Sequence, residues 1–521
     1  MSKVTSLDDA LSAIRPGDTV ASVGVIGWLV PDALLKGIAD RFKAGHGAGG
    51  LTFFFPVGVG DALGIPGMDH VAAPGLMRRV VSGNYINPVH PTTGCRPALM
   101  RMINDDVVEA YAWPIGATMH WLREVARRGP GYLTKIGLGT FIDPAQGGGR
   151  LNARTTEDLV HRCEFRGEEY LHYPTWDLDV GLIRASAADE AGNLRFDDEP
   201  LQSAALATAL AVKACGGTVI AQVARIVPRG QTPAGMMRVP GALVDSVVVE
   251  PHAMMTTGVA HDPRYLGGRF SREGLAVLPR GTDKVIARRA AREVRRHEVA
   301  IFGFGLATGI PLVMAEDGLF DGNGIDDFPH TTEHGAFGGV VMNGWQFSAN
   351  LFPEAMIDGP SQFDFIDGGN CRLAALSFAQ LDAAGNVNVS KFSGFSPGSG
   401  GFIDIATCAE RLVLTGTLTT GGLQCELTDR GLEIVQEGRI CKFVTTVDQV
   451  TYPLLRGVIE RNQQALVVTE RAVFRMDAQG LVLIEIADGM DLERDVLGQM
   501  QCGPIRVAPD LVRMDPALFA A

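Results

Sequence analysis

Hydrophobic and polar positions along the chain follow first a helical, then a strand-like, then again a helical spacing. Residues 6–9 have the spacing of a capping box, Ser-Leu-Asp-Asp, which predicts the start of a short helix. The apolar run at 19–23 predicts a buried strand. Gly24 and Gly27 then indicate a tight turn. Pro31-Asp32 is expected to open a second helix, whose apolar side carries Leu34, Leu35, Ile38 and Phe42.

A second stretch of the chain repeats this layout. Residues 282–297 have helical spacing, with arginines on the face opposite the apolar positions, and 299–302 predict a strand. Gly303-Phe304-Gly305 indicates a turn, and Pro311 occupies the step that Pro31 occupies in the first unit. We therefore expect an α/β fold of two similar halves, each with a central, largely parallel sheet.

A segment rich in proline, glycine and charge separates these two units. We therefore predict that the chain consists of an N-terminal half at residues 1–265, a linker at 266–283 and a C-terminal half at 284–521. Near the end of the chain the pattern predicts three short strands and then a closing helix. They are expected at 465–470, 472–477, 481–487 and 491–500.

Composition narrows the class of function. The chain has 521 residues, too many for a single core, and its net charge is −13 without a basic block, which argues against nucleic-acid binding. Its eight cysteines form no CxxC pair, so no metal site is expected. The start has no apolar signal region, and the uncharged stretch 299–315 is shorter than the roughly 20 residues of a membrane span. A cytoplasmic protein without a membrane partner is expected.

The first candidate for chemistry is Glu333, which lies among small residues in the run 331–339. A carboxylate is a poor nucleophile in water because its hydration shell screens the charge. In a dry, glycine-lined pocket it can attack an activated acyl group and form a mixed anhydride. The alternative is an ordinary loop glutamate beside a glycine turn. His334 is a possible base, or else a positioning or surface residue.

Two glycine loops could bind a ligand. Residues 303–309 imitate a dinucleotide fingerprint, but the third glycine is one residue late and no ribose-binding acid is clearly placed downstream. This turn could still hold a phosphate or pantetheine chain, or no ligand. In the loop 398–404, free amides could form an oxyanion hole for a thioester oxygen, and Asn388 could add a donor. An ordinary tight turn is the alternative.

A third motif, Gly394-Phe395-Ser396-Pro397-Gly398, matches the nucleophile elbow of serine hydrolases. That elbow needs an acid and then a histidine later in the chain. No histidine follows His334, so a serine hydrolase is excluded.

Together these motifs resemble the family I CoA-transferases, and most of all the propionate and acetate CoA-transferases with both halves fused in one chain. The first half is similar more loosely, at 24–31 and 113–116. Ile115 stands where several members of the family have a glutamine that helps to hold the thioester oxygen. In the second half the matching stretches are 332–339, 361–369, 385–392, 400–403, 416–422 and 489–497.

The resemblance implies that Glu333 is the catalytic nucleophile and passes through a glutamyl-CoA thioester. It implies oxyanion donors around Gly400 and Gly401, and a pantetheine arm near Gly303 and Gly305. Coenzyme A is then a substrate, with no permanently bound cofactor, and the partners are a short-chain acyl-CoA and a carboxylate such as acetate. A homodimer or homotetramer is expected by analogy. An acyl-CoA hydrolase using the same glutamate and a non-catalytic CoA-binding protein remain alternatives.

Overall fold

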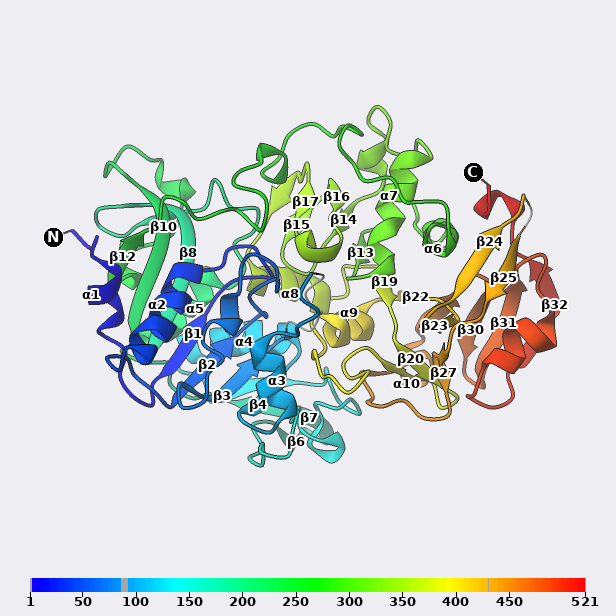
Figure 1. Ribbon diagram of the computed structural model, residues 1–521, viewed down its shortest axis with the longest axis horizontal. Helices are drawn as coiled ribbons and strands as arrows, with labels where there is room; N and C mark the ends of the chain where they lie inside the picture. Colours follow the sequence, from blue (N-terminus) through cyan, green and yellow to red (C-terminus); the bar gives the residue numbers. More distant parts are fainter. Residues whose placement is uncertain (1, 86–91, 430, 521) are drawn as a thin grey trace.

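The helices and strands gather into two α/β halves that lie side by side (Figure 1). The structure, a computed structural model, describes residues 2–85, 92–429 and 431–520. Within these ranges, one large sheet is built from strands of the N-terminal half and another from strands of the C-terminal half. The expected division into two α/β halves is confirmed.

The N-terminal sheet is parallel through its centre. Its strands lie in the order β11-β9-β8-β1-β2-β3-β4, with β10 paired to β8 and β12 to β10. Strands β2 and β8 are buried along their whole length, which agrees with their mostly apolar and small residues, although β8 also carries the buried Arg184 and Asp189. The bounds are β1 Thr19–Ser22, β2 Leu51–Phe55, β3 Met77–Ser82, β4 Glu109–Ala112, β8 Val180–Asp189, β9 Leu194–Arg195, β10 Thr218–Val227, β11 Met237–Val239 and β12 Ser246–Val249.

The two helices predicted for this half begin where the sequence places them. The Ser6 side chain accepts a hydrogen bond from the Asp9 amide at 3.1 Å and caps α1. Helix α2 follows Pro31 and buries Leu34, Leu35 and Ile38. The helices are α1 Leu7–Leu11, α2 Asp32–Lys43, α3 Ala98–Asn104, α4 Ile115–Ala126 and α5 Ala205–Ala214, and a small antiparallel sheet joins β5 Gly131–Thr134, β6 His161–Phe165 and β7 Glu168–Pro174.

The C-terminal sheet is mixed, in the order β18-β15-β14-β13-β19-β22-β29-β30-β31-β32. It is parallel from β14 to β29, whereas β15 and β30 pair antiparallel with their neighbours. The bounds are β13 Ala300–Phe302, β14 His330–Thr331, β15 Ala336–Phe337, β18 Ala355–Met356, β19 Leu373–Ser377, β22 Arg411–Thr415, β29 Gln464–Val468, β30 Ala472–Asp477, β31 Gly480–Ile486 and β32 Arg506–Arg513, with helices α6 Thr282–Ala291, α7 Gly309–Glu316, α8 Gly359–Asp367, α9 Phe402–Cys408 and α10 Leu454–Arg461.

Two element predictions for this half were wrong in extent. The helix expected at 282–297 ends at Ala291, because the Arg411 side chain binds the Glu293 carbonyl at 2.7 Å and His297 takes a positive φ of 64°. The closing helix expected at 491–500 is a π-helical turn, Leu492–Val496, followed by a 3-10 turn. The fold continues beyond it with β32, which pairs in parallel with β31.

The chain crosses between the halves in the segment from β12 to α6. Tyr265 packs on Trp28 of the N-terminal half, with ring centroids 4.9 Å apart. Phe270 packs edge-on against Phe320 of the C-terminal half at 5.8 Å. These contacts are compatible with a linker near 266–283, whose bounds stay a prediction.

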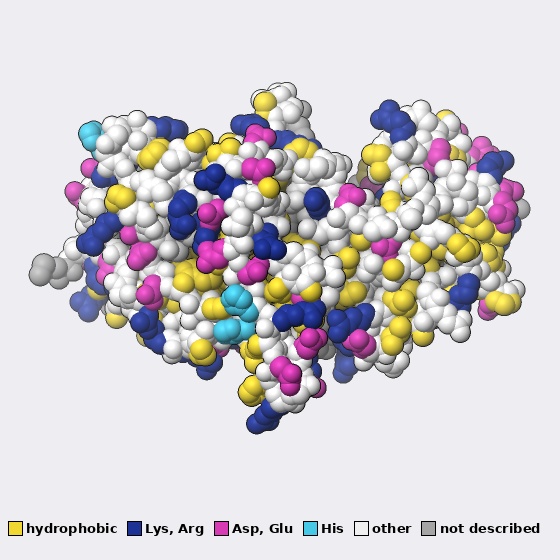
Figure 2. Space-filling model, turned by 90° about the horizontal axis from the view of Figure 1, so that it is seen from below, with side chains coloured by type: hydrophobic (Ala, Val, Ile, Leu, Met, Phe, Trp, Pro, Cys, Tyr) yellow, Lys and Arg dark blue, Asp and Glu magenta, His cyan; other side chains and the backbone are white. Residues whose placement is uncertain are grey.

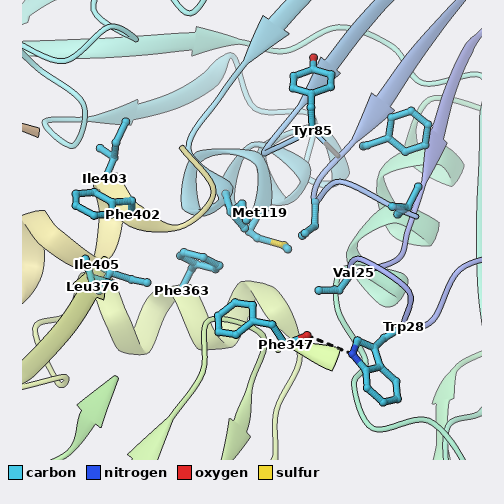
Figure 3. Close-up of a cluster of buried hydrophobic side chains, with 14 of the residues drawn as sticks. Val25, Trp28, Tyr85, Met119, Phe347, Phe363, Leu376, Phe402, Ile403 and Ile405 are labelled. Carbon is cyan, nitrogen blue, oxygen red and sulfur yellow. Dashed lines mark hydrogen bonds between the residues drawn. The ribbon is translucent and has the colours of Figure 1, made fainter. Parts of the chain in front are cut away.

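The halves share a buried apolar core (Figure 3). Val25, Trp28 and Met119 come from the N-terminal half and meet Phe347 and Phe363 from the C-terminal half. The Trp28 indole donates a hydrogen bond to the Phe347 carbonyl at 3.2 Å. The core therefore fixes one half against the other beside the loops that carry the candidate site.

Charged side chains of both signs are interspersed on the face seen from below (Figure 2). In the described part of the chain, every helix is too short or too polar to cross a membrane.

Candidate active site

The loop that carries Glu333 joins strands β14 and β15 and is held from several sides. The buried Gln362 side chain, on α8, donates to the Thr331 hydroxyl at 3.1 Å and to the Thr332 carbonyl at 2.8 Å. The Thr332 hydroxyl donates to the Ser348 carbonyl at 3.1 Å. Gly335 has φ +94°, and a Cβ there would lie 2.1 Å from a backbone oxygen, so only glycine allows this turn. Glu333 is thereby presented from a rigid loop.

One oxygen of the Glu333 carboxylate accepts a hydrogen bond, and the other lies close to an imidazole ring. The Gly401 N–H donates to Oε2 at 3.1 Å. His334 is buried and its Nε2 lies 3.3 Å from Oε1. A Cβ at position 401 would lie 2.2 Å from Oε2, so the glycine makes room for the carboxylate. The hydrogen bond from Gly401 orients the carboxylate, and 15% of the Glu333 side-chain surface is exposed.

Glu333 opens into a cavity of about 670 Å³ at the junction of the two halves. Such a volume suits a small-molecule site. The walls are mainly apolar, and among the described residues that line the cavity none is Lys or Arg. Aromatic walls come from Tyr85, Phe304, Trp345, Phe347, Phe378, Phe392 and Phe402.

The structure brings four of the five expected binding residues to this cavity. Gly303 and Gly305 line it in the turn after β13, and Gly400 and Gly401 line it before α9. The Gly400 amide, however, donates to the Gly83 carbonyl at 3.1 Å, so in this conformation the amide of Gly401 is the one aimed at the carboxylate.

Asn388 lies elsewhere. It is fully buried on β21 (Asn386–Asn388), is absent from the cavity lining, and its amide donates to the Gln380 side chain at 2.7 Å and to the Lys391 carbonyl. Its side-chain oxygen accepts from the amides of Ser390 and Lys391. The structure therefore places Asn388 as a support of the neighbouring turn rather than as a donor to a ligand.

The N-terminal half contributes residues that sequence reasoning missed. Asn84 and Tyr85 line the cavity after β3, and no motif in the sequence marked them. Ile115 is buried outside the lining, against Gly83, and its amide donates to the Gly400 carbonyl at 3.1 Å. Its backbone supports the glycine loop, while its side chain does not reach the cavity.

Behind the cavity wall lies a buried lysine whose pKa is lowered. Lys442 lies over the ring of Phe378, 4.2 Å from its centroid, and Gly416 leaves space for its ammonium group. Burial lowers the pKa of Lys442 to about 8, opposed by the charge of Glu470.

Known proteins resemble the chain over its whole length. A family model for coenzyme A transferases matches residues 4–250. The chain is 38% identical over 519 residues to the acetate CoA-transferase YdiF of Escherichia coli K12, covering 99% of this chain and 95% of that protein. The chain belongs to the coenzyme A transferase family.

Other members of the family agree. The caffeate CoA-transferase of Acetobacterium woodii is 36% identical over 532 residues, covering 100% of this chain and 98% of that protein. A crystal structure of the acyl-CoA transferase YdiF from Escherichia coli O157:H7, a thioester complex with CoA, matches with a TM-score of 0.90 and 36% identity, over 99% of this chain and 96% of that one. The resemblance found from the motifs is confirmed, and the protein is a CoA-transferase.

Proposed function

We propose that this CoA-transferase moves CoA from a short-chain acyl-CoA to a carboxylate acceptor such as acetate, with Glu333 as its nucleophile. The observation that carries this is the Glu333 carboxylate, which accepts a hydrogen bond from the Gly401 N–H and lies 3.3 Å from His334 Nε2, at the wall of a mainly apolar cavity between the halves. The glutamate lies in a mainly apolar, fixed environment of the kind that makes a weak nucleophile effective.

The reaction begins with attack of a Glu333 oxygen on the acyl-CoA carbonyl. The carbon–sulfur bond breaks, CoA leaves as a thiolate and an acyl-glutamyl anhydride forms. The thiolate then attacks the glutamyl carbonyl and expels the acyl group as a free carboxylate, leaving a glutamyl-CoA thioester. An acceptor carboxylate attacks that thioester, and the same two steps in reverse release the new acyl-CoA and free Glu333.

The Gly401 amide suits this sequence of steps. Two of the attacks fall on the glutamyl carbonyl carbon, and each places negative charge on a glutamyl oxygen. The amide, already 3.1 Å from Oε2, is placed to stabilise that charge as an oxyanion donor. We assign the Gly303–Gly305 turn to the pantetheine arm because both glycines line the same cavity as Glu333.

Substrate preference follows from the cavity walls. Since no Lys or Arg occurs among the described lining residues, the walls favour acyl groups with uncharged tails. The named relatives act on acetate and on caffeate, and this range of acids is compatible with the aromatic lining. A homodimer or homotetramer in the cytoplasm is part of the proposal and is supported by family resemblance alone.

The test is to trap the protein with an acyl-CoA in the absence of acceptor, digest it and weigh the peptide that contains Glu333. We expect the mass of a CoA thioester on that peptide, and none on the same peptide of Glu333→Gln, which should also lack transferase activity. Full activity in the parent with an unmodified Glu333 peptide during turnover would refute the mechanism.

Acyl-CoA hydrolysis by the same glutamate is the alternative for the second half of the reaction. It shares the first two steps, and water in place of the acceptor ends the cycle. An assay that counts CoA passed to acetate against CoA set free separates the two. The whole-length similarity to named transferases favours transfer.

A further inference from the structure

A carboxyl group is buried between the halves, directly behind the loop that contacts Glu333. Asp404 lies in the first turn of α9, three residues after Gly401, and only 1% of its surface is exposed. The glycine loop 398–404 includes it, but the proposed chemistry gives it no task. A buried acid in this position requires an explanation, because burial of an unpaired charge is costly.

Asp404 joins the glycine loop to the start of helix α4. The Gly116 amide, in the first turn of α4, donates to Asp404 Oδ2 at 3.2 Å. The preceding amide, of Ile115, donates to the Gly400 carbonyl at 3.1 Å. The first two N–H groups of α4, which have no partner within the helix, therefore both bind the segment 400–404 of the other half.

The fit at this contact is close. A Cβ at Gly116 would lie 2.2 Å from Asp404 Oδ1 and 2.8 Å from the ring of Phe363, so a glycine is needed for the carboxyl group to approach the helix. Phe363, Phe402 and Ile405 belong to the buried cluster shared by the halves (Figure 3). The Asp404 side chain, which projects from α9, thus packs against the first turn of α4 beside Phe363 of α8.

The groups around Asp404 disfavour its charge. Burial raises the pKa of Asp404 well above its usual value, and the nearby carboxylates of Asp367 and Glu333 raise it further, opposed by the Gly116 amide. Tyr132 and Tyr173, from the β5-β7-β6 sheet, and Cys408 also face it. Asp367 is itself paired with His120 of α4 at 2.9 Å.

We propose that Asp404 is a positioning residue for the transfer reaction: it fixes the glycine loop to α4 so that the Gly401 N–H stays aimed at Glu333. The neutral carboxyl group is the form that does this, because a second negative charge behind the loop would repel the Glu333 carboxylate. This proposal rests on the proposed role of Glu333 and adds a dependence of that role on the N-terminal half.

Three substitutions and one control test it. Asp404→Asn keeps the shape and an acceptor for the Gly116 amide without a charge; Asp404→Ala removes the group, and Asp404→Leu fills its space without a hydrogen bond. Asp364→Asn is the control, since half-exposed Asp364 also joins α8 to α4, through Arg123, but does not touch the glycine loop. For each variant, kcat, KM for acyl-CoA and the single-turnover rate of adduct formation on Glu333 are measured.

We expect Asp404→Asn to keep kcat within about threefold, because the Gly116 bond survives. Asp404→Ala and Asp404→Leu should lower kcat and the adduct rate together by about 100-fold, with a small change in KM, since only the alignment of the attack changes. Asp364→Asn should match the parent. Parent-like kcat in Asp404→Ala or Asp404→Leu would overturn the proposal, as would an Asp404→Asn as slow as they are.

Thermal melting against pH provides a second readout. The pKa of Asp404 is raised in the folded protein, so its neutral form contributes to the free energy of unfolding. This contribution is complete below the ordinary pKa of 3.8 and is lost as the pH rises toward the pKa in the folded protein. Asp404→Asn should therefore gain in melting temperature relative to the parent as pH rises from 5 to 8. A constant difference would show an ionised Asp404 and refute the neutral form. Absence of any adduct in the parent would instead refute the mechanism on Glu333.

Discussion

Replacement of Gly401 by alanine tests the geometry around the nucleophile most directly. The residue has φ −83° and ψ 3°, in the bridge region, which is open to residues that carry a Cβ, so the backbone does not exclude the change. The new Cβ would lie 2.2 Å from Glu333 Oε2. An ordinary contact needs about 3.4 Å, so the carboxylate must retreat by about 1.2 Å or the loop must move.

The cost of that displacement can be estimated. A shift of about 1 Å in a reacting group costs about 100-fold in rate, and loss of one oxyanion donor costs about 100- to 1,000-fold. We expect Gly401→Ala to lower kcat by about 100- to 1,000-fold, which corresponds to about 3–4 kcal/mol in the activation barrier. KM for acyl-CoA should change little, because contacts with the CoA tail are unaffected.

The assay follows transfer of CoA to acetate by mass spectrometry, together with the single-turnover adduct on Glu333. Gly235→Ala is the matched control: it lies in the 3-10 turn Ala234–Met236, and a Cβ there would meet nothing within 4 Å. It should retain the parent's kcat. A Gly401→Ala protein that folds normally and forms the adduct at the parent's rate would refute the assignment of the Gly401 amide.

Two further predictions concern charge. Butyrate should exceed succinate as acceptor by at least about 100-fold in kcat/KM, because a second carboxylate would be buried without a cation; equal rates would contradict the apolar assignment of the cavity. Lys442→Met should have a higher melting temperature than the parent, and the difference should be larger at pH 7 than at pH 10. A folded pKa of about 8 against the ordinary 10.5 means that the parent gains stability as pH rises between those values, by about 3 kcal/mol at most. A gain from Lys442→Met that is the same at both pH values would refute this.

Predictions from the sequence held where a feature depends on residues a few positions apart. The cap at Ser6, the strand at 19–23 and the glycine turn at 303–305 were placed correctly, because capping, strand burial and positive φ are local properties. The helix expected at 282–297 failed at its end, where Arg411, far along the chain, binds a carbonyl of Glu293. Asn388 resembled a donor to a ligand only because its partners could not be seen.

The sequence by itself determined the α/β class, the glycine turns and, through the motifs around Glu333, the family of the protein. The tertiary structure decided which of the expected groups meets that glutamate: the amide of Gly401, and not that of Gly400, donates to its carboxylate. Gly401 contacts it across 68 residues, and Gly116 contacts Asp404 across 288. Neither contact can be read from its spacing in the sequence, because both depend on tertiary packing: Gly401 meets Glu333 within the C-terminal half, and Gly116 meets Asp404 across the boundary between the halves. The cavity between the halves is a property of the same packing.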